Sequence, residues 1–250
     1  MRFLGLTPLI FCLLVSAQPP QLDGDDLSLS LGFAVVANQE GYGDDDNQIL
    51  PIPLIDLRYQ RFSFQGIQAG FDLVQSRTWS WKITARPEFN GFEEDDGEIF
   101  AGMDDRELAA MVGTSLDFRF ANRFSLSMSA ETDVSGRNDG HVAEVSLSRL
   151  FTAQRTLIIP SIGVQWQSED FNRYYYGVRP EEARPFRPAY QPEDAFAANV
   201  GVLVSHPLSE KMTLTFLGQW QPYPSEIENS PLVDEAQSLF GFFGLSWKIR

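Results

Sequence analysis

Apolar and polar residues alternate one by one through much of this chain. In the segment WSWKITAR, Trp79, Trp81 and Ile83 occupy one phase, while Ser80 and Lys82 occupy the other. Because successive side chains of a β-strand point to opposite faces, this period of two predicts an all-β fold. Eleven segments show the pattern, near residues 27–37, 51–60, 62–74, 78–89, 108–120, 124–134, 141–150, 156–168, 196–206, 211–220 and 239–249.

One of these segments, 62–74, leaves the number of strands open. Its apolar phase slips at Gly66, which predicts either a β-bulge or a turn between two short strands. Bacterial single-chain barrels have an even number of strands, so the sequence favours twelve, with ten as the alternative.

Alternation occurs in soluble β-sandwiches as well as in transmembrane antiparallel β-barrels. Two features favour the barrel. The polar phase is rich in serine, threonine, glycine and glutamine, as in a wet lumen, and many segments reach the roughly 9–11 residues that a tilted membrane strand requires. All tryptophans lie in the apolar phase near expected strand ends, where a lipid-facing wall carries an aromatic girdle. The expected girdle consists of Trp79, Trp81, Trp166, Trp220 and Trp247.

The N-terminus has the form of an export signal. The stretch MRFLGLTPLIFCLLVSA combines an arginine, an apolar run and a final pair of small residues, so residues 1–17 are interpreted as a signal peptide. A short segment, 18–26, then leads into a barrel of residues 27–250. Cys12 is the one cysteine and lies in the signal. The mature chain is therefore expected to use no disulfide, thiolate metal site or thiol catalysis.

The net charge of -15 limits the possible partners. A nucleic-acid-binding surface must be locally basic, so nucleic acid is excluded as a partner. Carboxylates suit calcium or magnesium, but no calcium-loop motif is present, and solvated charge runs are expected. Loose cation bridging to lipopolysaccharide phosphates is a hypothesis. The acidic residues concerned are Asp44, Asp45, Asp46, Glu93, Glu94, Asp95, Asp96, Asp104, Asp105, Glu226, Glu228, Asp234 and Glu235.

Catalysis finds little support in the sequence. His141 and His206 are the two histidines, and Asp139 lies close to His141. No spacing singles out a serine nucleophile for them. We expect a protein that is not an enzyme, with no catalytic residues, no metal and no cofactor.

The connections between the expected strands fall into two classes. Short ones are expected to face the periplasm and long ones to face outward. The short connections are 121–123, 151–155 and 207–210, and the long ones are 38–50, 90–107, 169–195 and 221–238.

The longest connection contains FNRYYYGVRPEEARPFRPAY, which is unusually rich in tyrosine and arginine for so acidic a chain. The arginines are expected to fold inward, where an acidic barrel supplies partners, and so to narrow the pore. Tyrosine rings can stack on sugars or pack against an inner wall. The segment is interpreted as a structural plug or as a recognition site for glycan or peptide, with a loop of no special role as the remaining alternative. Its candidate residues are Arg173, Tyr174, Tyr175, Tyr176, Arg179, Arg184, Arg187 and Tyr190.

Four stretches of the chain carry a recognisable set of motifs. In the longest connection the motif residues are Tyr175, Tyr176, Gly177, Val178, Pro180, Ala183, Pro188, Ala189 and Tyr190. The other three stretches are GFAVVANQEGYGDDDNQILPIPLIDLRY, NGFEEDDGEIFAGMDDRELAAMVG and NSPLVDEAQSLFGFFGLSW. Together they resemble the MipA/OmpV family of outer-membrane proteins, and the resemblance covers nearly the whole mature chain. Arg179 departs from the serine or threonine that the family often has there, and Arg250 departs from the usual terminal aromatic residue.

The resemblance implies a location in the bacterial outer membrane. It further implies a non-enzymatic scaffold or adaptor that brings together peptidoglycan-remodelling enzymes, namely a lytic transglycosylase and a penicillin-binding protein. A small porin-like channel or a surface adhesin is the alternative.

Overall fold

The computed structural model describes residues 27–39, 41–43 and 48–250. The expected signal peptide, the segment 18–26 and the acidic run Asp44–Asp46 lie outside these residues. Among the described residues, no helix is both long enough and apolar enough to cross a bilayer.

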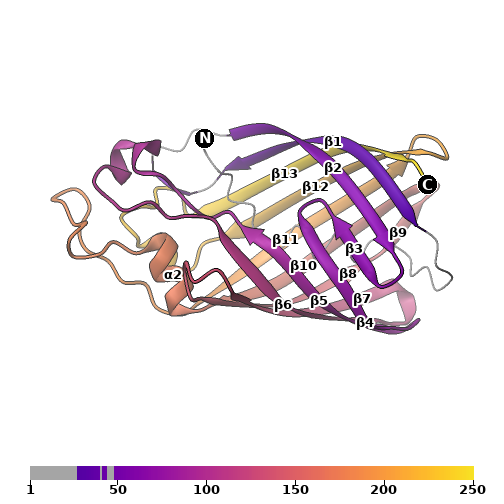
Figure 1. Ribbon diagram of the computed structural model, residues 1–250, viewed down its shortest axis with the longest axis horizontal. Coiled ribbons are helices and arrows are strands. Elements are labelled where there is room, and N and C mark those ends of the chain that lie inside the picture. The colour runs from indigo at the N-terminus through magenta and orange to yellow at the C-terminus, as the bar shows by residue number, and fades with distance from the viewer. Residues whose placement is uncertain (1–26, 40, 44–47) are drawn as a thin grey trace.

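All strands belong to one antiparallel sheet that closes on itself through the pairing of β10 with β11 (Figure 1). From β1 to β8 and from β10 to β13 consecutive strands pair with each other, β8 and β9 both pair with β10, and β1 pairs with β13. The strands are β1 (Ser28–Gln39), β2 (Gln48–Tyr59), β3 (Phe62–Gln65), β4 (Gln68–Gln75), β5 (Trp79–Glu88), β6 (Ala109–Arg119), β7 (Phe124–Asp133), β8 (His141–Arg149), β9 (Phe151–Ala153), β10 (Thr156–Gln167), β11 (Ala195–Pro207), β12 (Met212–Pro222) and β13 (Gln237–Lys248).

Strands β8 and β9 are two parts of one wall strand. Ser148 of β8 faces Ser161 of β10, and Phe151 of β9 faces Ile158 in the same register. The ladder is interrupted beside Pro160, which has no N–H to donate to a neighbouring strand. The barrel wall therefore has twelve strands, as the sequence favoured.

The segment 62–74 contains a turn and not a continuous strand. Gly66 has a φ of 60° and turns β3 back into β4, which supplies the twelfth wall strand. A separate irregularity between Asp72 and Val74 shifts the register of β4 against β5. The slip in the apolar phase thus marked the turn, one of the two predicted alternatives.

The two phases of the strands face opposite sides of the wall, as predicted. On β5, Trp81 and Ile83 are exposed on the outside, whereas Ser80, Lys82 and Thr84 are buried in the interior. The outer surface is a band of large apolar side chains, among them Phe33 at 60% and Phe243 at 53% exposure. So much contiguous apolar surface is typical of a lipid-facing wall.

The two ends of the barrel differ in their connections (Figure 1). At one end the strands are joined by short turns and the chain reaches its C-terminus. This end includes the 3-10 turn η3 (Ala121–Arg123); the expected short connection 151–155 is shorter than predicted, because residues 151–153 form β9. At the other end lie the long loops with η1 (Glu94–Asp96), η2 (Glu98–Phe100), α2 (Glu169–Tyr176) and α3 (Ser225–Glu228).

The tryptophans lie near both ends of the wall. Trp79 and Trp81 start β5 and Trp247 lies near the end of β13, all on the short-turn side, whereas Trp166 and Trp220 lie toward the long-loop side. Trp81, Trp220 and Trp247 are exposed on the outer surface. Their contact with lipid headgroups stays a prediction.

Candidate functional site: the loop cap and the barrel interior

The longest connection begins with a helix that sequence reasoning missed. Ser168 is the N-cap of α2, and its hydroxyl accepts a hydrogen bond from the N–H of Phe171 at 3.4 Å. Glu169 and Asp170 place negative charge in the first turn, where it complements the helix dipole. A serine followed by two acids was the signal that could have predicted this helix.

The three consecutive tyrosines lie on α2 and are drawn into an aromatic cluster. Tyr175 and Tyr176 are buried, and Tyr174 is half-buried. Tyr176 stacks on Tyr42 with ring centroids 5.6 Å apart, and the Tyr42 hydroxyl donates to the Tyr175 carbonyl at 3.2 Å. We call the whole cluster the loop cap. Its buried members are Tyr42, Phe92, Phe100, Met103, Met111, Val142, Phe171, Tyr175, Tyr176, Val178, Ile227 and Leu232.

The loop cap is seated on the inner wall of the barrel mouth. Met111 of β6 and Val142 of β8 belong to the inward phase of their strands, are almost fully buried and pack in the cap. Burial and the negative charge of Glu88, at the end of β5, raise the pKa of Tyr175, so its hydroxyl stays protonated. The same hydroxyl accepts a hydrogen bond from Asn138 at 3.2 Å. Four connections therefore meet over the long-loop mouth.

A buried ion pair fastens two of these loops together. Nη2 of Arg106 lies 2.9 Å from both carboxylate oxygens of Glu182. The same guanidinium donates from Nε to the carbonyl of Tyr174 at 2.7 Å. Arg106 was not among the predicted residues, because nothing in its local sequence distinguishes it from an exposed loop arginine.

Glu182 also organises the turn at Pro180. Its carboxylate accepts from the N–H of Arg179 at 3.0 Å, as the third residue of a capping box does. The N–H of Glu182, which a serine or threonine at position 179 could cap, donates instead to the backbone carbonyl of Arg179 at 3.0 Å. Burial raises the pKa of the Glu182 carboxyl, but the hydrogen bonds from Arg179 and Arg106 and the charge of Arg106 outweigh it. The pKa therefore lies below its ordinary value, and the carboxylate is charged at neutral pH.

The candidate arginines do not converge on the lumen as expected. Arg173, Arg179 and Arg184 are exposed; Arg173 pairs with Glu169 on the same helix, and Arg179 pairs with Asp104 at 2.5 Å. Arg187 is buried, and it donates to loop carbonyls, including that of Ala101 at 3.2 Å. Their partners are backbone carbonyls and carboxylates of the long loops themselves.

Tyr190 joins the two ends of the loop segment 178–190. Its backbone pairs with Val178 in both directions, at 2.9 and 3.0 Å, and its hydroxyl donates to the Glu226 carbonyl at 3.0 Å. The tyrosine thus ties the longest connection to the loop that carries α3.

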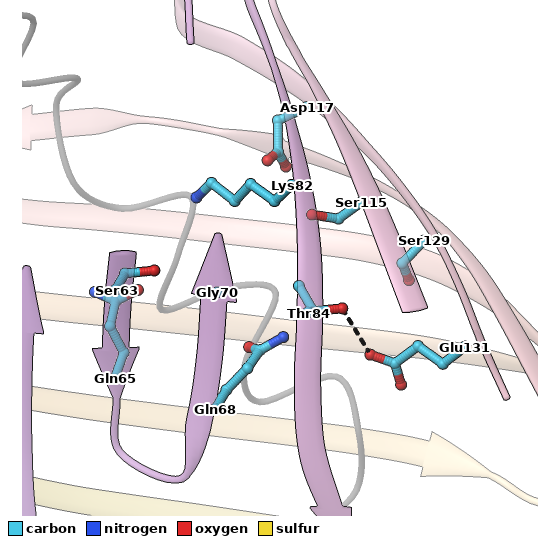
Figure 2. A pocket seen from close by; sticks show the side chains of 10 residues that line it. All are labelled: Ser63, Gln65, Gln68, Gly70, Lys82, Thr84, Ser115, Asp117, Ser129 and Glu131. Atoms are coloured by element: carbon cyan, nitrogen blue, oxygen red, sulfur yellow. Dashed lines mark hydrogen bonds between the residues drawn. The ribbon is translucent and has the colours of Figure 1, made fainter. Parts of the chain in front are cut away.

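The inner face of β3 to β7 is polar, and Figure 2 shows the side chains that line a small cavity there. Lys82 of β5 lies 3.9 Å from Asp72, and Asp117 of β6 accepts from the hydroxyl of Ser127 at 2.7 Å. Arg86 pairs with two acids, Glu88 at 2.9 Å and Glu131 at 2.7 Å. The cavity among these side chains holds about 20 Å³, room for little more than one water molecule. It is lined by Ser63, Gln65, Gln68, Gly70, Lys82, Thr84, Ser115, Asp117, Ser129 and Glu131.

The inner face of the remaining strands carries a cluster of apolar side chains beside buried polar ones such as Gln165, Asn199 and Gln219, and the expectation of a wet lumen did not include this cluster. We call it the apolar strip: a continuous set of inward side chains on β10 to β13 and β1. Half-buried apolar residues of β2 and the β3–β4 turn pack against it. The strip consists of Ala34, Val36, Ile159, Leu203, Leu217, Phe240 and Phe242.

The acidic residues of the second long loop have structural roles. Asp96 accepts from the N–H of Glu93 at 2.8 Å, and Asp105 accepts from the N–H of Glu94 at 2.8 Å. Glu94 in turn accepts from the N–H of Gly102 at 2.9 Å. Within residues 27–39, 41–43 and 48–250, no group of three or more His, Cys, Asp or Glu side chains is arranged to hold a metal.

The two histidines lie at opposite ends of the barrel. His141 begins β8 at the long-loop end, and its N–H donates to Ser168 at 2.9 Å. His206 lies near the short-turn end of β11, with its Nδ1 2.8 Å from the Thr156 hydroxyl.

Comparison with known proteins identifies relatives over most of the chain. The family model described as "MltA-interacting protein MipA" matches residues 31–249. The MltA-interacting protein of Escherichia coli K12 is 29% identical over 230 residues, which cover 88% of this chain and 89% of the relative. The outer membrane protein YiaT of the same strain is 28% identical over 223 residues, covering 88% and 90%. Among solved structures, the NanC porin has a TM-score of 0.44 at 8% identity, covering 89% of this chain and 100% of the porin.

Proposed function

Because this chain belongs to the MltA-interacting protein MipA family and is an outer-membrane β-barrel, we propose that it is a non-enzymatic scaffold for peptidoglycan-remodelling enzymes. One relative is named for its interaction with MltA, which supports a lytic transglycosylase as one partner. A penicillin-binding protein is the proposed second partner. The long loops then face outward, where lipopolysaccharide is the neighbouring lipid, and the short turns face the periplasm.

The proposal rests on the charge of the short-turn end. In a chain with a net charge of -15, the described turns and strand ends on this side carry a ring of exposed basic side chains, and among these described residues Glu210 interrupts the ring. We call it the basic rim. It consists of Arg61, Arg77, Arg123, Arg149, Arg155, Lys211, Lys248 and Arg250.

Aromatic side chains accompany the rim. The Arg149 guanidinium lies 4.9 Å from the ring centroid of Phe124 and 4.8 Å from that of Phe151. Exposed arginines beside aromatic rings are typical of protein-binding surfaces, and a ring of one charge favours an acidic partner. The long-loop end of the barrel is acidic. An acidic protein surface in the periplasm would therefore be attracted to the basic rim and not to the opposite end.

The loop cap favours a scaffold over an open channel. Solute flow along the barrel axis requires an open mouth, whereas aromatic side chains of four connections pack over this one. The cavity between the polar side chains of β3 to β7 is also small, at about 20 Å³. A channel would need the cap to move.

Co-elution tests the proposal directly. The full mature barrel, purified in detergent, is mixed with a purified lytic transglycosylase and passed over a size-exclusion column. We expect co-elution, and we expect its loss in the triple variant Arg61→Glu, Arg77→Glu, Arg155→Glu. The matched control, Arg137→Glu, Arg173→Glu, Arg184→Glu, changes the same charge at the long-loop end and should still co-elute. Absence of co-elution together with measurable solute flux in liposome swelling would instead support the channel.

A further inference from the structure

The second long loop encloses a cavity of about 320 Å³, far larger than the cavity of about 20 Å³ in the barrel interior. It lies between two arms of the loop, residues 89–93 after β5 and residues 105–108 before β6. We call it the loop cavity. Pockets that hold small molecules have volumes of roughly 300–1,000 Å³, so the loop cavity has room for a small organic ligand.

The two arms are fixed to each other by backbone contacts. The N–H of Arg106 donates to the carbonyl of Phe92 at 2.8 Å, and the N–H of Phe92 donates to the carbonyl of Arg106 at 3.2 Å. Gly91 allows this close approach, because a Cβ atom at that position would clash with the carbonyl oxygen of Arg106. Asp105 adds a further link by accepting from the N–H of Glu94 at 2.8 Å. The walls are therefore preformed, which lowers the entropic cost of binding a ligand.

The inner part of the loop cavity is apolar. Phe92 is buried, and its ring stacks on Phe100 of the loop cap with the centroids 4.2 Å apart. Phe89 is half-buried and packs on the apolar strip, whereas Leu108 is 37% exposed. Both line the cavity, so a ligand that covers them removes apolar surface from water. This part of the cavity suits a small apolar or aromatic group.

The charges around the loop cavity favour a cation. Arg106 is the one basic residue of the lining; it is 2% exposed, and the Glu182 carboxylate already matches its charge. The acidic residues of the lining outnumber it and lie toward the mouth, where most of them are exposed. A negative cleft attracts cations and repels anions. These acidic residues are Glu93, Asp96, Asp105 and Glu107.

We propose that the loop cavity binds a small organic cation, in which one ammonium or guanidinium group is joined to an apolar or aromatic body. The body covers Phe89 and Leu108, and the cationic group lies among the carboxylates at the mouth, which include Asp105. A bare metal ion fits less well, because the apolar wall gives it no ligands and the described part of the chain has no metal-holding group of acids. The site is independent of the scaffold role, which uses the basic rim at the other end.

Fluorine NMR tests the proposed ligand class. The full mature barrel in phosphatidylcholine nanodiscs is titrated with 4-fluorophenethylammonium, and line broadening gives the dissociation constant. The alcohol 4-fluorophenethanol has the same aromatic body without a charge. We expect saturable binding of the cation and binding of the alcohol that is weaker by at least about fivefold, the upper range for one exposed ion pair. Equal affinity for both probes, or broadening no greater than in empty nanodiscs, would overturn the proposal.

Variants then locate the bound cation. Leu108→Trp fills the apolar part and should abolish saturable binding, whereas Leu208→Trp adds the same ring at an exposed leucine of the short-turn end and should not. Asp105→Asn keeps an oxygen for the N–H of Glu94 and should weaken the ammonium probe about two- to fivefold while leaving the alcohol unchanged. Asp170→Asn, at an exposed position of α2, is the matched control for the charge.

Folding of each variant is checked by the gel shift between boiled and unboiled samples. Leu108→Lys places a cation in the loop cavity from within and should also abolish binding, so it replaces the tryptophan variant if that one does not fold. Binding that persists in the folded variants of Leu108 would contradict the proposed site. An equal loss in Asp105→Asn and Asp170→Asn would do the same, because it would reflect the overall charge of the long-loop end.

Discussion

Arg106 and Glu182, which lie 76 positions apart in the chain, form a bidentate ion pair inside the loop cap, with both oxygens of the carboxylate 2.9 Å from Nη2 of the arginine. Their side chains are 1% and 3% exposed. The pair joins the second long loop to the longest one and thereby holds α2 against the barrel mouth.

Replacing Glu182 with glutamine tests this role. Removing one partner of a buried pair leaves the other charge uncompensated, which costs about 3–5 kcal/mol. We expect the E182Q barrel to remain folded while its long loops become sensitive to protease and lose hydrogen-exchange protection. Glu181→Gln changes the exposed neighbouring carboxylate and should behave as the native protein. Equal protection of the loops in both variants would show that aromatic packing alone holds the cap.

The same carboxylate predicts an acid dependence of the cap. The folded-state pKa of Glu182 lies below its ordinary value of 4.5. The stabilisation is therefore complete above the ordinary pKa and is lost as the pH falls through the lower, folded-state pKa. Limited proteolysis of the long loops should accelerate in that acidic range for the native protein. In E182Q, where this group cannot titrate, the loops should be cut at a rate that changes less over the same interval.

The strand pattern was predictable because it is local, whereas the contacts of the cap are not. Trp81 and Ser80 reveal their opposite faces through immediate neighbours, and Gly66 marks the hairpin turn by interrupting the phase. Arg106 and Glu182, by contrast, become partners only when two loops meet over a closed barrel. The spacing of Arg106 and Glu182 in the sequence does not reveal how close they lie in the folded barrel.

The character of the barrel interior was also only partly predictable from the sequence. The inward phase of β5 is polar and was expected to line a wet lumen, but Val36 and Phe242 also point inward. Both phases of β1 and β13 are largely apolar in this region, so alternation alone cannot separate lipid-facing from lumen-facing residues.

A pair of arginine substitutions on β12 tests the orientation of the wall. Leu214 belongs to the outward phase with Phe216, whereas Thr215 belongs to the inward phase with Leu217. Leu214 lies two positions from Met212, which aligns with Trp247 of the expected girdle, so Leu214→Arg should cost less than the roughly 2–4 kcal/mol of an arginine at the midplane. It should still cost more than Thr215→Arg, whose charge points into the barrel near its short-turn end. Unfolding in denaturant, followed by refolding into vesicles, gives both values. Equal losses would contradict the assigned phase.

Deletion of residues 174–188 tests whether the cap closes the barrel. The deletion removes Tyr175 and Tyr176 from the aromatic cluster together with the Glu182 ion pair. We expect higher single-channel conductance in planar bilayers than for the native barrel, which should conduct little. Phe186→Ser, at a position that is 63% exposed, is the control and should leave conductance unchanged. Unchanged conductance in a correctly folded deletion variant would rule out a plug.

Fluorescence quenching tests the predicted aromatic girdle. The indole N–H of Trp220 donates to Gln237 at 2.8 Å, and that of Trp81 donates to Thr114 at 2.6 Å. Neither indole N–H therefore needs water as a hydrogen-bond partner. Variants that each retain one tryptophan, with phenylalanine at the other four positions, are reconstituted with lipids brominated at different depths. Indole rings favour the headgroup level, so Trp220 and Trp247 should be quenched most by bromines close to the headgroups. Trp81 lies two residues further into its strand than Trp79 and should respond to deeper bromines. If bromines at the ends of the lipid acyl chains quench every tryptophan most strongly, the indole rings lie at the bilayer centre and do not form a girdle.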